Sequence, residues 1–335
     1  MTSDPVALAI ELMRRDSTSG AEGAVLAWAG RRLEDEGWHV TRIPVSEGRH
    51  DLLATVADGA PPLVTLSTHL DTVPPYLPPR LDGDVLRGRG ACDAKGIAAA
   101  MWCAADRLRA AGVPVALLFV VGEETTHDGA SAANRVPTTS RVLVNGEPTE
   151  STLALGTKGA LRVTVRCEGR AAHSAYPHLG RSATGDLVRL LAGLDDLELP
   201  SDPLLGETTI HIGRLEGGVA DNVIAPWAEA RLMARLVSPA DEVLERLRRW
   251  AGDRATIEGG VSVPPVRLGT LPGFPTSVAA YATDIPALDR WGTPYLFGPG
   301  SIHVAHTPDE HVVVAELVAA VDAYERIARE ALERE

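Results

Sequence analysis

Hydrophobic and polar positions change their period several times along the chain. Between Pro5 and Glu36 the apolar residues recur at helical spacing, which predicts one or two surface helices. Further along, short runs rich in branched residues predict strands that helical stretches separate. These runs are Leu63–Thr68, Val115–Val121, Arg141–Val144 and Tyr295–Phe297. The alternation predicts an α/β fold, a mixed sheet with helices on both faces.

A different pattern fills residues 160–268. A strand over Leu161–Cys167 is followed by a helix, two strands, a second helix and a last strand near Arg254–Val263. The order β-α-β-β-α-β is typical of a ferredoxin-like α+β unit. Because the α/β pattern returns afterwards and closes with a long helix over Val312–Leu332, we expect an inserted domain. Residues 1–159 and 269–335 are predicted to form the other domain together.

Composition excludes several classes of partner. The formal net charge of −13 disfavours nucleic acid and anionic membranes as partners. No apolar run reaches the roughly 18 to 20 residues that a membrane helix needs, and the first residues lack the pattern of a secretory signal. The odd set Cys92, Cys103 and Cys167 has no metal-type spacing. We therefore expect a cytoplasmic protein whose cysteines are packing residues.

Acidic residues and histidines recur where the predicted strands end, which is where ligand sites form in open α/β sheets. His69 and Asp71 follow the Leu63–Thr68 run at a spacing of two, so the carboxylate is expected to orient the imidazole toward a metal. A structural histidine pair is the alternative. Asp93 ends a glycine-rich turn before a helix, where it is either a bridging metal ligand or a helix N-cap.

Three glutamates and two histidines complete the candidate set. Glu123 and Glu124 follow the most apolar strand, where two adjacent carboxylates repel each other unless a cation or proton stabilises them. Glu147 follows the next strand, and a loop late in the chain carries His303 and His306. Solvated surface positions are the ordinary alternative for each residue alone. Together they supply the oxygen and nitrogen ligands of a binuclear zinc centre.

In this order the segments strongly resemble the M20 family of metallopeptidases and deacylases, over nearly the whole chain. The matching motifs are Ser67-Thr-His-Leu-Asp-Thr72, Gly88-Arg-Gly-Ala-Cys-Asp-Ala-Lys-Gly96, Glu123-Glu124, Asn145-Gly-Glu-Pro148 and Ala172-His-Ser-Ala-Tyr-Pro177. The resemblance implies two zinc ions, for which cobalt or manganese can substitute. It implies that Asp93 bridges them, with His69 and Glu147 on one ion and Glu124 and His306 on the other.

The resemblance also implies roles for the remaining candidates. Glu123 is expected to be the general base and acid, and Asp71 to support His69. The inserted domain resembles the family's lid and dimerisation domain, whose His173 is expected to reach the partner's site in a homodimer. The expected substrate-binding residues are Asn222, Arg235, Gly298 and Ser301. One departure is that Ala225 precedes Pro226, where the family usually has proline directly after Asn-Val-Ile.

The segment from Gly298 to Glu310 is most similar to that of acetylornithine deacetylase. The first expectation is therefore a deacetylase of arginine biosynthesis that removes an acyl group from a small N-acylamino acid. A dipeptidase, tripeptidase or carboxypeptidase that uses the same centre on short peptides is the main alternative. A metal-binding relative without catalysis is the second.

Overall fold

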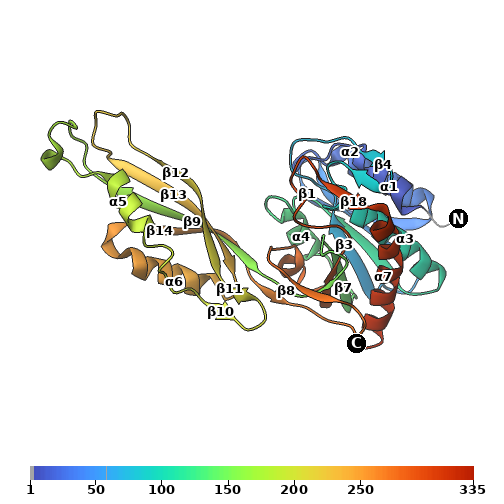
Figure 1. Ribbon diagram of the computed structural model, residues 1–335. Coiled ribbons are helices and arrows are strands. Elements are labelled where there is room, and N and C mark those ends of the chain that lie inside the picture. The colour runs from blue at the N-terminus through green and yellow to red at the C-terminus, as the bar shows by residue number, and fades with distance from the viewer. Residues whose placement is uncertain (1–3, 58) are drawn as a thin grey trace. The chain divides into compact units, whose positions relative to one another are not determined.

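The computed structural model describes residues 4–57 and 59–335, which fall into two compact units (Figure 1). Unit 1 contains the chain up to Leu155, then Leu268–Ser277 and Thr283–Glu335. Unit 2 contains Gly156–Arg267 and the short piece Val278–Ala282. The chain therefore leaves unit 1 for unit 2 and later returns to unit 1.

Unit 1 is built on a six-stranded mixed sheet, which confirms the predicted α/β class. Its strand order is β1-β2-β6-β3-β7-β17. β6, β3, β7 and β17 run parallel, whereas β1 and β2 are antiparallel additions at one edge. The strands are β1 (Trp38–Ser46), β2 (Arg49–Val56), β3 (Val64–His69), β6 (Val115–Val120), β7 (Val142–Gly146) and β17 (Thr293–Phe297).

Both faces of this sheet are buried because helices cover each of them. Leu117 and Phe119 of β6 pack with one set of helices, and their neighbours Leu118 and Val120 pack on the opposite face. The first face is covered by α1 (Pro5–Met13), α2 (Gly23–Asp35), α3 (Lys95–Ala110) and α7 (Val314–Leu332). The second face is covered by α4 (Asp128–Ala133) and the short 3₁₀ helix η3 (Ile285–Leu288). A strand buried on both sides reads as one continuous apolar run, as β6 does.

Local sequence signals explain where several of these elements begin and end. α1 starts at Asp4, whose carboxylate accepts a hydrogen bond from the Val6 amide at 2.9 Å, and Pro5 occupies the first helical position. After α3 the chain turns at Gly112, which has φ of +76°. A small sheet completes unit 1, with β4 (Arg80–Asp82), β5 (Val85–Arg87) and β18 (His311–Val313).

Unit 2 has a four-stranded antiparallel sheet of order β12-β13-β9-β14. Val165, Leu187, Leu232 and Leu247 lie in its core, between the sheet and its two helices. This is the strand arrangement of a ferredoxin-like unit. The elements are β9 (Gly159–Glu168), α5 (Ala183–Leu191), β12 (Thr209–Gly217), β13 (Trp227–Leu236), α6 (Ala240–Ala251) and β14 (Thr256–Val263), with a hairpin of β10 (Ser201–Asp202) and β11 (Gly206–Glu207).

A third small sheet has the strand order β15-β8-β16. Its strands are β8 (Leu153–Thr157), β15 (Val266–Arg267) and β16 (Thr276–Ala279). Among residues 4–57 and 59–335, no helix combines the length and apolar character needed to cross a bilayer. The three cysteines are buried, consistent with packing positions.

Candidate metal centre

The candidate ligands gather at the carboxyl ends of the parallel strands of unit 1. His69 is the last residue of the central strand β3, Glu147 directly follows β7, and Glu123 and Glu124 follow β6 after a turn at Gly122. Parallel strands end at the same edge of a sheet, so side chains from these three strands converge. Asp93 is added from the turn before α3.

Asp93 lies between two histidines and contacts each with a different oxygen. Its Oδ1 is 3.1 Å from His69 Nε2, and its Oδ2 is 3.2 Å from His306 Nε2. The side chain is almost entirely buried, whereas that of His306 is 49% exposed. A carboxylate that faces a different histidine with each oxygen has the geometry expected of a bridging ligand.

Two glutamates extend the cluster, each beside a different histidine. Glu124 Oε2 lies 2.9 Å from His306 Nε2, and Glu147 Oε1 lies 3.9 Å from His69 Nε2. Ligand atoms of His69, Asp93 and Glu124 lie within 4.8 Å of one another. The structure thus brings all five sequence-predicted ligands together around Asp93, and the group within 4.8 Å combines His69 with Glu124, which the M20 resemblance assigns to different ions.

The electrostatics of the cluster reflect several carboxylates crowded into a buried place. Burial, reinforced by the charge of neighbouring carboxylates, raises the pKa of Glu123, Glu124 and Glu147. Hydrogen bonds to Asp93 and Glu124 raise the pKa of His306 to about 10. Although burial acts in the opposite direction, hydrogen bonds from His306 and His69 lower the pKa of Asp93.

These donors fit divalent cations. Imidazole nitrogens and carboxylate oxygens are the ligands that zinc and related metals take in proteins. Cations placed among the side chains would offset the mutual repulsion of the carboxylates, which burial otherwise makes costly. By the M20 resemblance, His69, Asp93 and Glu147 would hold one ion, and Asp93, Glu124 and His306 the other.

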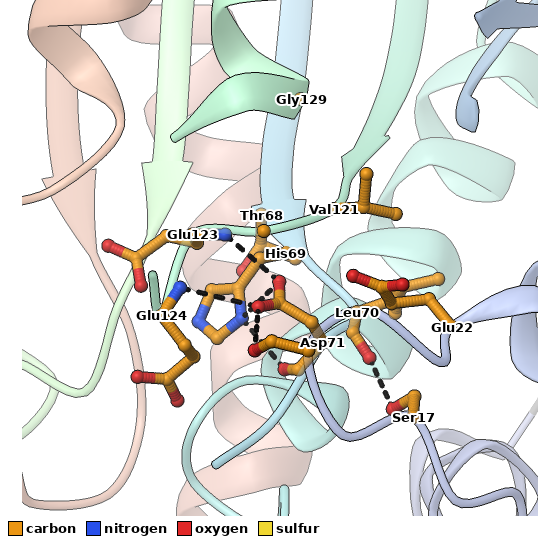
Figure 2. Close-up of polar contacts among 12 residues, drawn as sticks. Ser17, Glu22, Thr68, His69, Leu70, Asp71, Val121, Glu123, Glu124 and Gly129 are labelled. Carbon is orange, nitrogen blue, oxygen red and sulfur yellow. Dashed lines mark hydrogen bonds and ion pairs between the residues drawn. The ribbon is translucent and has the colours of Figure 1, made fainter. Parts of the chain in front are cut away.

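Asp71 does more than orient the histidine. Its backbone carbonyl, rather than its carboxylate, makes the closer contact with His69 Nδ1, at 3.0 Å against 3.6 Å. The carboxylate instead accepts hydrogen bonds from the backbone amides of Glu123 and Glu124, at 3.1 and 3.3 Å (Figure 2). Ser19 donates a third hydrogen bond to it. Asp71 therefore ties the turn that carries both glutamates to the end of β3.

Glu310 has a similar anchoring role that we did not predict. It accepts hydrogen bonds from the backbone amides of Gly90 at 2.8 Å and Asp93 at 3.3 Å, and it forms a buried ion pair with Arg89. The glycine-rich turn that presents Asp93 is held in this way from a residue 217 positions away in sequence.

The two candidate histidines of the late loop differ in their contacts. Both side chains are largely exposed, but His306, which has φ of +64°, contacts Glu124 of the cluster. Gly298 is explained by close packing, since a Cβ there would lie 2.3 Å from the Glu147 carbonyl oxygen. Ser301 donates a hydrogen bond to Glu150 at 2.7 Å. Substrate binding by Gly298 and Ser301 stays a prediction.

The other three predicted residues belong to unit 2. His173 is exposed and pairs with Val223 in an isolated bridge, so it lies beside Asn222, whose carbonyl accepts a hydrogen bond from Ser174 at 2.9 Å. Arg235 is half-buried near the far end of β13. It follows Trp227, the first residue of that strand, by eight residues, or about 26 Å at the rise of a strand.

Comparison with known proteins identifies the family. The sequence profile of peptidase family M20/M25/M40 matches residues 65–330. The chain belongs to the M20 family. A peptidase M20 domain-containing protein of Schizosaccharomyces pombe is 39% identical over 96% of this chain and 83% of its own length. A probable carboxypeptidase of Aspergillus fumigatus is 36% identical over 97% of this chain and 86% of its own length.

The fold agrees with this M20 assignment. The crystal structure of aminopeptidase PepT from Bacillus cereus superposes with a TM-score of 0.80 at 21% identity, covering 98% of both chains. The resemblance of the sequence to M20 is therefore confirmed, and with it a hydrolase of amide or peptide bonds. The named carboxypeptidase relative favours the peptidase alternative over the deacetylase that we expected first.

Proposed function

We propose that this M20 protein is a two-metal carboxypeptidase that removes the C-terminal amino acid from a short peptide or an N-acylated amino acid. The observation that carries the proposal is Asp93, whose two oxygens face His69 and His306 separately. Glu124 and Glu147 complete two ligand groups beside it. Zinc suits this donor set, and cobalt and manganese accept the same ligands.

We propose Glu123 as the residue that moves protons. The carboxylates of Glu123 and Glu124 point in different directions (Figure 2). Glu124 contacts His306, whereas the Glu123 carboxylate lies 3.8 Å from His127. Divalent cations supply Lewis acidity, which lowers the pKa of water and polarises a carbonyl oxygen. Glu123 takes the proton of the attacking water and delivers it to the nitrogen as the C–N bond breaks, which yields a carboxylic acid and an amine.

A panel of candidate substrates, each incubated with the metal-loaded enzyme, tests which of them the protein hydrolyses. We expect dipeptides and N-acylamino acids with a free carboxylate to be hydrolysed, and their C-terminal amides to be at least ~10-fold poorer in kcat/KM, because a charge-assisted contact is lost. Chelation should abolish activity and metal should restore it. N-acetylornithine as the best substrate would favour the deacetylase, and no hydrolysis at all would reject the function.

We also propose a homodimer in which unit 2 of one copy completes the site of the other. Asn222 and His173 lie beyond one end of β13 and Arg235 near its other end. A small substrate is much shorter than the roughly 26 Å between those ends. One copy therefore cannot offer both groups to one substrate, whereas two copies related by a two-fold axis can.

Subunit mixing tests the shared site. A His173→Ala protein mixed with a Glu123→Gln protein should recover about a quarter of wild-type activity, since random exchange makes about half of the dimers hybrid, each with one intact site. Differently tagged chains verify exchange. His178→Ala, an exposed histidine nearby, serves as the matched control and should stay active. Verified exchange without recovery would contradict sharing.

A further inference from the structure

A second cluster of titratable side chains lies beside Glu123, and the proposed chemistry leaves it unused. His127 Nδ1 is 2.8 Å from Asp284 Oδ1 and 3.8 Å from Glu123 Oε1. The Asp284 side chain is 2% exposed and that of His127 is 19% exposed. The imidazole therefore contacts both carboxylates, and its short contact is with Asp284.

The backbone fixes His127 in this place. Its φ is +54°, a left-handed value that is uncommon outside glycine and typical of functional or strained positions. Its amide donates to the Gly122 carbonyl at 2.8 Å, which closes the turn that contains Glu123. Its carbonyl accepts from Ser131 at 3.0 Å at the start of α4. His127 is thus the last residue of the turn that carries the proposed base.

Asp284 holds His127 from the other side. It immediately precedes η3, and η3 packs against α4. The contact between His127 and Asp284 joins segments 157 residues apart in sequence. The turn that carries Glu123 is therefore secured twice, by Asp71 through its amides and by Asp284 through His127.

The charges of Asp284, His127 and Glu123 explain what this contact can do. Asp284 is a buried carboxylate, and the same imidazole nitrogen that lies 2.8 Å from it lies 3.8 Å from Glu123, so the two carboxylates are close neighbours. Burial lowers the pKa of His127, but the hydrogen bond and charge of Asp284 outweigh burial and raise it. A protonated imidazole that contacts both carboxylates offsets their repulsion. Without it, the Glu123 side chain would be repelled from Asp284 toward other positions.

We propose that His127, held by Asp284, is a positioning residue that fixes the carboxylate of Glu123 for proton transfer. The inference rests on the proposed function, since it assigns Glu123 the role of base. The same three side chains offer ligand atoms within 4.8 Å of one another. A third metal ion there would occupy Glu123 and leave it unable to carry protons, so we treat that arrangement as a competing outcome.

The test is a double-mutant cycle in the metal-loaded protein. His127→Asn keeps a side chain that tolerates left-handed backbone but removes the imidazole charge. We expect kcat to fall roughly 10- to 100-fold with KM within about twofold, because misplacing a catalytic group by about 1 Å costs on that order. Asp284→Asn in the His127→Asn background should recover most of the lost kcat, since the repelling charge is gone. A purely structural pair would show a further loss instead.

Controls separate this role from its alternatives. His39→Asn, an exposed histidine on β1, should behave as wild type. Metal analysis should find two ions per chain in wild type and in His127→Asn. A wild-type kcat in His127→Asn, a loss of either ion, or a third ion that disappears on substitution would each overturn the proposal.

A crystal structure gives a second readout, which does not depend on activity. In a crystal structure of metal-loaded His127→Asn, the Glu123 carboxylate should move by about 1 Å or more, or occupy a second conformer. An unchanged Glu123 side chain would overturn the inference. If the wild type hydrolyses nothing on the substrate panel, the proposed function fails, and the position of Glu123 still decides whether His127 positions it.

Discussion

The Glu123→Gln protein should bind two metal ions like the wild type and lose at least ~10² in turnover, the lower end expected for a positioned acid–base group. Glutamine has nearly the same shape as glutamate, but its amide cannot take a proton from water. The backbone hydrogen bond from residue 123 to Asp71 is unaffected by the change. The neighbouring Glu124, which faces His306, keeps its carboxylate. The loss should therefore appear in kcat and not in metal content.

Metal content per chain and steady-state kinetics on the preferred panel substrate measure the effect. Glu325→Gln, in a surface ion pair on α7, is a matched control that makes the same chemical change away from the centre. It should retain full turnover. Near-normal turnover of Glu123→Gln would show that another group moves the proton, and loss of an ion would show that Glu123 is a ligand.

The sequence predicted most of the residues that lie together in this cluster, because the signals for them are local. His69, Glu124 and Glu147 each follow an apolar run, and such runs at strand spacing in an α/β protein predict parallel strands. The ends of parallel strands meet at one edge of the sheet, so residues that directly follow such strands are expected to lie close together. The Val115–Val121 run, all apolar, is the clearest example and forms β6 as expected.

The same reasoning did not predict that the Asp71 carboxylate would accept hydrogen bonds from the turn after β6. A spacing of two puts side chains on one face only while the strand continues. β3 ends at His69, so Asp71 lies outside the strand, and its carbonyl makes the closer contact with the imidazole. Its carboxylate is directed toward the turn after β6, where two amides donate to it. Strand periodicity cannot indicate a contact made after the strand has ended.

Contacts between segments far apart in the sequence were also not predicted. Glu310 reaches the turn before α3 across more than two hundred residues, and His127 pairs with Asp284 across 157. No local pattern predicts such pairs, because they depend on how whole elements pack. The hairpin of β1 and β2 was missed for a related reason: β1 is a largely exposed edge strand with many polar residues, so its apolar alternation is weak.

Replacing Asp93, the proposed shared ligand, should have the other large effect. Asp93→Asn keeps the shape of the side chain but replaces one carboxylate oxygen with an NH₂ group, which cannot bind a cation, and removes the negative charge. Because each oxygen faces a different histidine, both ligand groups lose affinity. Losing a residue that only supports a ligand typically costs ~10- to 100-fold in metal affinity or activity. We expect a larger loss here, with fewer than two ions retained and turnover below that of Glu123→Gln.

Stability provides an independent measure of the same change. A metal that binds only the folded protein stabilises it by about 2.7 kcal/mol at a free concentration one hundred times its Kd. Adding zinc to chelated wild type should therefore raise its denaturation midpoint, and chelation should lower it again. The Asp93→Asn protein should show little of this rise, whereas Asp322→Asn, an exposed aspartate on α7, should show all of it. An Asp93→Asn protein that binds two ions and responds to zinc like the wild type would mean that Asp93 does not join the two ligand groups.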